Sequence, residues 1–372
     1  MEPEKANKKK HRFQNVEFLR FIFVISIIIY HLFTGWLPAY CDSVPLFKTL
    51  FETTRDAVRA VDFFFIISGF FLVYTFKKDL SVIDFIKKKI IRLWPVAIFA
   101  VGAWTVIYLL GFITPERYGT LDNVFGLFMI NNIGITTGIG INIQSWYVSS
   151  LILVLLFYFY MLKYLERPVV NLIISVITLF CYSFLVHIQK GSLTGEIETY
   201  YYIFNVGVMR AFAGCGLGYL IANSGICSNI RKEYSLKTRL ISGFIELGLL
   251  VFLVYNMFFN KLVYTNDMIF VLAFVLLFII FIKNCGLFSI LFSNKISDFF
   301  GKYTYSIYMA HRISFAILSV TLWKTAFVAR HSYMTILYSI IIAILFGILV
   351  YYLIEKPFAA VLKKMLLKPT NS

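Results

Sequence analysis

The chain alternates long apolar segments with short polar connections. An apolar stretch of about 20 residues crosses the ~30 Å hydrocarbon layer of a bilayer as one helix. Such stretches lie at residues 14–37, 58–76, 93–112, 146–162, 169–187, 200–222, 240–257, 266–282, 303–323 and 335–355. The pattern predicts an all-α, polytopic membrane protein with about ten transmembrane helices.

Composition supports this fold class. Of the 372 residues 60% are hydrophobic, 19% are aromatic and only 15% are charged. A soluble domain is nearer half apolar and a quarter charged, so soluble globular classes are excluded. The five cysteines show no metal-ligand spacing, so neither a metal site nor a disulfide framework is expected.

The net charge of +16 encodes topology rather than affinity for nucleic acid. With a cytoplasmic N-terminus, about three Lys/Arg fall on the cytoplasmic side for each one outside, as the positive-inside rule requires. We therefore expect both termini in the cytoplasm, with basic tails at 1–13 and 358–372 flanking a single transmembrane domain over 1–372. The first span lacks a small-residue cleavage site and should be an anchor.

Two connections stand out from the rest. Residues 113–145 form the longest one and should be a partly re-entrant or external surface loop, since loops of this length are usually functional. Residues 77–92 are basic and amphipathic, which favours a segment lying along the anionic inner surface of the membrane.

Charged residues inside spans cost at least ~2.5–3.5 kcal/mol each and usually mark function. Arg20 and His31 lie eleven residues apart in the first span, so they share one helix face and are separated by roughly 16 Å along the axis. His31 is embedded in an apolar run, which favours an acid/base role over packing. Arg20 could equally reach inner-leaflet phosphates as a snorkelling anchor.

Asp62 enters the second span from the external side, close to the depth that His31 reaches from inside. A carboxylate at that depth could pair with the imidazole, fix its tautomer and stabilise its protonated form. The alternative is an Asp hydrated at the external edge. Ser68 and Gly69 lie deeper, where the glycine allows a close backbone approach.

Lys89 and Arg92 are two cations three residues apart at the cytoplasmic mouth of the third helix. They could grip a phosphate, although snorkelling anchors look the same. Glu246 has no assigned role. Further polar groups fall in later spans, namely Arg210, Tyr305, His311 and Glu355.

Taken in order, these segments resemble the acyltransferase-3 family of integral membrane acyltransferases. The resemblance covers most of the chain and rests on Glu17-Phe18-Leu19-Arg20 through His31, Val61-Asp62 through Ser68-Gly69-Phe70, Lys88-Lys89 through Arg92-Leu93-Trp94-Pro95, Ser145-Trp146-Tyr147-Val148-Ser149, Gly301-Lys302 through His311, and Ile354-Glu355-Lys356-Pro357. Two departures matter. Many members carry a Glu where this chain has Leu151, and the first cation of the Lys89/Arg92 pair is usually Arg, whose bidentate phosphate geometry Lys lacks.

The resemblance implies transfer of an acyl group, usually acetyl, from cytoplasmic acyl-CoA to hydroxyls of surface glycans or their lipid-linked precursors. It makes Arg20 and His31 the essential pair, and Asp62, whose depth matches that of His31, is the third expected catalytic residue. Residues expected to bind the donor are Arg20, Ser68, Gly69, Lys89 and Arg92. Residues expected to line the substrate path are Trp146, Tyr305, His311 and Glu355.

The expected partners are acyl-CoA as a donor substrate, a glycan or lipid-linked glycan, the lipid bilayer and other glycan-assembly proteins. No tightly bound cofactor and no nucleic acid are expected. The expected location is the cytoplasmic membrane of a bacterium. We expect no extracytoplasmic domain of the kind that is fused to longer family members. The rival hypothesis is a transporter or flippase of a lipid-linked sugar, since buried charges also mark translocation paths, but no inverted repeat is evident.

Overall fold

A computed structural model describes residues 13–37, 45–112, 120–133, 140–194, 199–201, 204–226, 233–259, 266–324 and 331–367. Each of the ten apolar segments overlaps one long helix, although the segment at 200–222 begins with two short strands and its helix starts at Val206. The long helices are α1 (Gln14–His31), α4 (Ala60–Tyr74), α5 (Val82–Leu109), α7 (Ser145–Tyr164), α8 (Arg167–Ile188), α9 (Val206–Asn223), α10 (Leu236–Phe258), α11 (Met268–Lys283), α14 (Thr304–Val320) and α16 (Ser332–Val350). The all-α, polytopic prediction is therefore confirmed.

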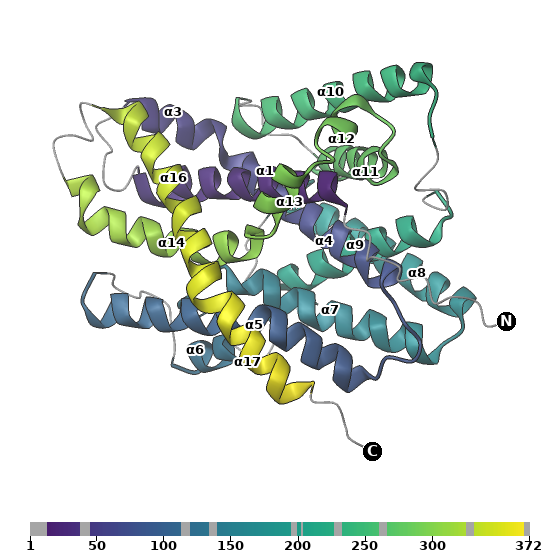
Figure 1. Ribbon diagram of the computed structural model, residues 1–372, viewed down its shortest axis with the longest axis horizontal. Helices are drawn as coiled ribbons and strands as arrows, with labels where there is room; N and C mark the ends of the chain where they lie inside the picture. Colours follow the sequence, from purple (N-terminus) through teal and green to yellow (C-terminus); the bar gives the residue numbers. More distant parts are fainter. Residues whose placement is uncertain are drawn as a thin grey trace.

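Short elements complete the bundle. They are the π-helices η1 (Leu32–Trp36) and η4 (Tyr351–Glu355), the 3-10 helices η2 (Arg55–Arg59) and η3 (Leu322–Lys324), the helices α3 (Pro45–Thr53), α6 (Thr120–Leu127), α12 (Leu287–Leu291), α13 (Lys295–Gly301) and α17 (Lys356–Leu366), and the strands β1 (Tyr200–Tyr201) and β2 (Phe204–Asn205). The two strands pair antiparallel. In Figure 1, α16, η4 and α17 form one long yellow helix across the front of α14 and α5.

Within the described residues, eight helices are long and apolar enough to cross a membrane. α11 is a shorter apolar helix of 16 residues. α14 has 17 residues, and its buried positions include hydroxyl and imidazole side chains. Because α14 packs against α1, α5 and α16, its polar groups face protein instead of lipid. This enclosed helix carries much of the site described below.

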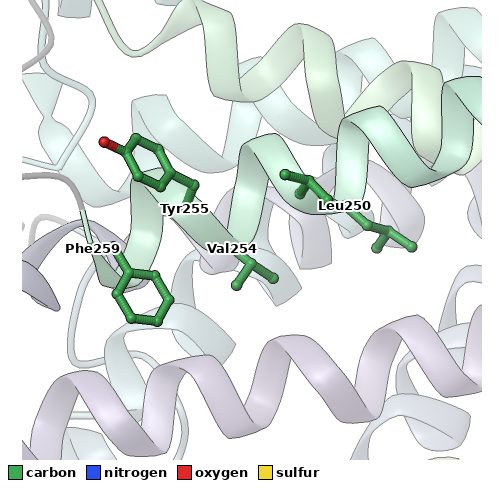
Figure 2. Close-up of a pocket in the computed structure, with 5 residues that line it drawn as sticks. Leu250, Val254, Tyr255 and Phe259 are labelled. Atoms are coloured by element: carbon green, nitrogen blue, oxygen red, sulfur yellow. The ribbon is translucent and has the colours of Figure 1, made fainter.

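The outer surface of the bundle is apolar. Leu250, Val254 and Tyr255 of α10 and Phe259, just beyond its end, line an open pocket at the surface (Figure 2). Val254 is 46% exposed and Phe259 is 65% exposed, a pattern typical of a surface solvated by lipid.

The close packing of α4 on α9 depends on glycine. A Cβ atom built at Gly69 would collide with the backbone of Cys215, and one at Gly214 would collide with Phe65. Small residues at such positions let helix backbones approach closely in a membrane. The close backbone approach at Gly69 is therefore to α9, and its place in a donor site stays a prediction.

The long connection does re-enter the bundle. The indole of Trp94, near the middle of α5, donates a 2.8 Å hydrogen bond to the carbonyl of Leu127 at the end of α6. The side chain of Asn132 reaches Ser150 of α7 at 3.1 Å and Asn205 at 3.2 Å. This part of the predicted re-entrant loop is confirmed; residues 113–119 and 134–139 lie outside the described residues.

The prediction of a separate surface segment at 77–92 is wrong over its second half. The Ser81 hydroxyl accepts a 2.9 Å hydrogen bond from the amide of Asp84 and caps α5. A capped N-terminus stabilises the first turn, so the helix begins at Val82 and continues without a break into the apolar span. Lys89 and Arg92 consequently sit on a rigid helix.

Glu246 has a structural role that the sequence did not reveal. Its carboxylate accepts hydrogen bonds from the amides of Phe288, at 2.8 Å, and Ser289, at 3.1 Å. These are first-turn amides of α12, which have no partner within their own helix. Glu246 is fully buried and serves as the N-terminal cap of α12.

Candidate active site

Two imidazoles meet in the interior of the bundle. His31 ends α1 and His311 lies in the middle of α14; their ring centroids are 5.2 Å apart. α1 and α14 pack side by side (Figure 1). His311 is fully buried whereas His31 is partly exposed. Arg312 lies within electrostatic range of both rings.

The hydrogen bonding of His311 fixes its tautomer. Its Nδ1 lies 2.7 Å from the carbonyl oxygen of Tyr308. A carbonyl can only accept, so in the neutral ring the proton is on Nδ1 and the lone pair is on Nε2. That Nε2 is buried without a hydrogen-bond partner. A buried, unpaired nitrogen lone pair beside a second imidazole is suited to accept a proton.

A cluster of charges lies toward the opposite end of α1. Arg20 donates a 2.7 Å hydrogen bond to Glu17. Arg92 of α5 lies within electrostatic range of Arg20, Glu17 and Glu355. Glu355, the last residue of η4, accepts a hydrogen bond from Ser306 of α14. The structure thus brings together Arg20, Arg92 and Glu355, which are far apart in the sequence.

The two cations on α5 are available for an anion. Within the described part of the chain, neither Lys89 nor Arg92 makes a hydrogen bond or an ion pair. The Lys89 ammonium lies 5.1 Å above the ring of Phe85, and Arg92 is exposed. Arg20 and Glu355 are partly exposed, so the cluster borders open space.

Polar side chains connect the cation cluster to the imidazoles. Tyr147 of α7 lies within electrostatic range of Arg92, with its hydroxyl toward Ser68 of α4. The Tyr147 ring is 5.6 Å from the ring of Tyr308. Tyr308 in turn lies 6.2 Å from His311, centroid to centroid. We call Ser68, Tyr147, Tyr305, Tyr308 and His311 the polar column.

Tyr305, which the sequence analysis expects on the substrate path, belongs to this column. Its hydroxyl donates a 2.7 Å hydrogen bond to the carbonyl of Leu93, one residue beyond Arg92. Tyr305, Tyr308 and His311 follow one another at intervals of three residues, which places them along one face of α14.

The predicted pairing of Asp62 with His31 is wrong. Both carboxylate oxygens of Asp62 accept hydrogen bonds from Arg210 of α9, at 2.7 and 2.9 Å. Asp62 and Arg210 are each 2% exposed. A guanidinium fork matches a carboxylate with two parallel bonds and full charge compensation, which a single imidazole cannot supply. Asp62 therefore joins α4 to α9.

The prediction for Trp146 also needs correction. Its ring is 6.0 Å from the ring of Phe65 and 5.9 Å from the guanidinium carbon of Arg210. It is 7% exposed and packs beside the Asp62–Arg210 ion pair. The neighbouring residue, Tyr147, instead reaches the polar column.

Some features of the site were missed at the sequence level. Tyr147 stood inside a recognised motif but received no role. Both π-helices adjoin a site residue, since η1 begins directly after His31 and η4 ends at Glu355. Single π-helical turns inside α-helices often occur at functional sites. No residue pattern in the sequence distinguishes them from α-helix.

Metal ligation has no support within the described ranges. They contain no group of three or more His, Cys, Asp or Glu side chains that could hold a metal ion. The chemistry available to these residues is proton transfer at the imidazoles and anion binding at the cations.

Comparison with known proteins adds the family. The acyltransferase-3 family model, described as an acyltransferase domain, matches residues 13–355. No curated protein and no solved structure matches the chain. The match spans most of the 372 residues and includes every residue assigned to the site. The chain is a multi-pass membrane protein with an acyltransferase domain and belongs to the acyltransferase-3 family.

Proposed function

We propose that the protein transfers an acetyl group from cytoplasmic acyl-CoA to a hydroxyl of a surface glycan or its lipid-linked precursor. The observation that carries this proposal is the polar column. At one end lie two cations that make no ion pair among the described residues, and at the other lies the buried His311 Nε2, which has no hydrogen-bond partner. We place the protein in the cytoplasmic membrane of a bacterium, with both termini in the cytoplasm. This orientation puts Arg20 inside and His31 in the outer half of the bilayer.

The cation cluster suits the phosphates of coenzyme A. Arg92 and Lys89 make no ion pair or hydrogen bond among the described residues, although Glu17 and Glu355 lie within electrostatic range of Arg92, and Arg20 pairs with Glu17. Charge-assisted contacts to phosphate are about twice as strong as neutral hydrogen bonds. The phosphates would rest here, and the pantetheine arm would extend along the polar column toward His31. Arg20 and His31 are roughly 16 Å apart along the helix.

The imidazole pair supplies the proton transfers. The acceptor hydroxyl oxygen attacks the thioester carbonyl while His31 takes the hydroxyl proton. As the carbon–oxygen bond forms and the carbon–sulfur bond breaks, the imidazolium returns that proton to the leaving thiolate. His311 adds its Nε2 lone pair beside His31, which is the supporting role that the sequence had suggested for Asp62. A positioned base of this kind contributes about 10²–10⁴-fold.

The rival transporter hypothesis lacks support, because the family is one of acyltransferases. A direct test uses purified protein in lipid nanodiscs with radiolabelled acetyl-CoA and a glycan fraction from the producing cells. We expect label in the glycan, release of free coenzyme A thiol, and loss of both with His31→Ala. Retention of most activity by a properly inserted His31→Ala protein would refute the mechanism.

Orientation has its own measurement. Lys87 lies near the start of α5, and Phe112 lies three residues beyond its end at Leu109. With the N-terminus inside, a membrane-impermeant thiol reagent applied to intact cells labels Phe112→Cys and spares Lys87→Cys. The reverse pattern would invert the topology and with it the side from which the donor enters.

A further inference from the structure

Two side-chain amides are buried without partners close to the imidazole pair. Gln144 is 2% exposed and Asn142 is 1% exposed. For both residues the amide nitrogen and the amide oxygen lack a hydrogen bond. Leaving one such group unpaired costs about 1–3 kcal/mol, so four unpaired atoms in one short segment call for a ligand.

Contacts place this segment beside the reacting centre. The hydroxyl of Tyr308 donates a 3.2 Å hydrogen bond to the backbone carbonyl of Gln144. Tyr308 also holds Nδ1 of His311 through its own carbonyl, and His311 faces His31. Gln144 is thus separated from the imidazoles by one tyrosine side chain.

An aromatic cluster continues from the imidazoles in the direction away from the cations. The ring of Phe315, one helical turn beyond His311, lies 5.9 Å from it. Trp36 at the end of η1 lies 6.4 Å from Phe315 and 6.4 Å from Trp104, whose ring it stacks on. The indole nitrogen of Trp104 is buried and has no hydrogen-bond partner.

We propose that Asn142, Gln144 and Trp104 form a binding subsite for the carbohydrate that accepts the acyl group. This inference rests on the proposed acyl transfer and specifies its acceptor side. A sugar ring presents hydroxyls at its edge and C–H groups on its face. Amides that both donate and accept suit the hydroxyls, and the stacked indoles of Trp36 and Trp104 suit the C–H face.

The composition of the subsite sets its specificity. None of its side chains carries a charge, so it favours neutral hydroxyl-bearing rings over anionic groups. A site built to hydrogen-bond a hydroxyl rejects an analogue that lacks it, because its own polar groups are then left unpaired. The amides would hold the sugar while one hydroxyl faces His31.

The test separates acceptor recognition from donor binding. Gln144→Ala, Asn142→Ala and Trp104→Phe are expressed in cells lacking the gene, and the acyl content of the surface glycans is measured by mass spectrometry. The same purified variants are titrated with acetyl-CoA. A matched control is Gln189→Ala, an amide at the end of α8. Loss of a net hydrogen bond worth about 0.5–1.5 kcal/mol predicts a roughly 2- to 13-fold fall in acylation per variant.

We expect acetyl-CoA affinity to stay within about twofold for the three variants, and Gln189→Ala to acylate as the wild type does. Full glycan acylation by the variants would overturn the subsite. An equal loss of acetyl-CoA binding would also overturn it, because the amides would then serve the donor. If the wild type itself acylates no glycan, the proposed function fails, which is a distinct outcome.

Discussion

The ion pair between Asp62 and Arg210 makes the sharpest stability prediction. Asp62→Asn keeps the shape of the side chain and removes its charge. Arg210 then remains buried at 2% exposure with two hydrogen bonds, of 2.7 and 2.9 Å, weakened or lost. Breaking one partner out of a buried pair costs about 3–5 kcal/mol, which is roughly two to three and a half powers of ten in the unfolding equilibrium.

Removing both charges should cost far less than removing one. Replacing a buried pair by apolar residues of similar volume is often neutral or stabilising. We therefore expect the double variant Asp62→Leu/Arg210→Met to recover most of the stability that either single change loses. The wild type, the two single variants and the double variant form a double-mutant cycle. Equilibrium unfolding in mixed micelles measures the free energy of unfolding of all four under one condition.

The cycle also discriminates between the two partners considered for Asp62. The observed ion pair predicts that the Asp62 and Arg210 changes are strongly coupled in the free energy of unfolding. It also predicts that the effects of Asp62→Asn and His31→Ala on that free energy are additive. A cost of Asp62→Asn below about 1 kcal/mol, or additive effects of the Asp62 and Arg210 changes, would refute the reasoning.

Four further variants test the other parts of the structure. Arg92→Ala should raise the Michaelis constant for the donor about 10- to 150-fold, because a hydrogen bond to a charged group contributes about 1.5–3 kcal/mol. Steady-state kinetics should show an unchanged Michaelis constant for the acceptor, whereas an equal rise in both constants would return Arg92 to an anchoring role. His31→Ala should lower kcat by about 10²–10⁴-fold. Adding His311→Ala should lower kcat little further, since the effects of residues that act as a unit are non-additive. Losses of kcat that multiply would show that the two imidazoles act independently. Glu246→Ala should lower stability by about 1–3 kcal/mol, because two buried amides of α12 lose their acceptor, with kcat unchanged; a kcat loss in folded protein would contradict its role as a cap.

Much of the fold was predictable, because a bilayer constrains the chain so strongly. Every apolar segment of sufficient length overlaps one long helix. The helix start at Val82 was predicted less well, since the capping serine stands inside a basic segment that resembles a membrane-surface helix. Local periodicity shows which side chains share a face, but not where a helix with a charged first turn begins.

The site was predictable in its residue types more than in its pairings. Arg20, Arg92 and Glu355 were each recognised, and the structure brings them together. Asp62 was given the wrong partner, because every spanning helix has residues at the same depth in the bilayer, so depth alone does not select one partner. Its observed partner, Arg210, lies 148 positions away in the sequence. Pairings between distant helices follow from packing, which one sequence does not reveal.

The π-helical turn after His31 has an evolutionary consequence. A π-turn holds one residue more than the α-helix it interrupts, so it is equivalent to a single-residue insertion accommodated inside a helix. Deleting one residue from 32–36 would restore continuous α-helical hydrogen bonding, and because the wider π turn had absorbed that residue, Trp36 would keep nearly its present direction relative to His31. Related chains can therefore gain or lose one residue at this turn while His31 and the aromatic cluster beyond it keep their relative orientation.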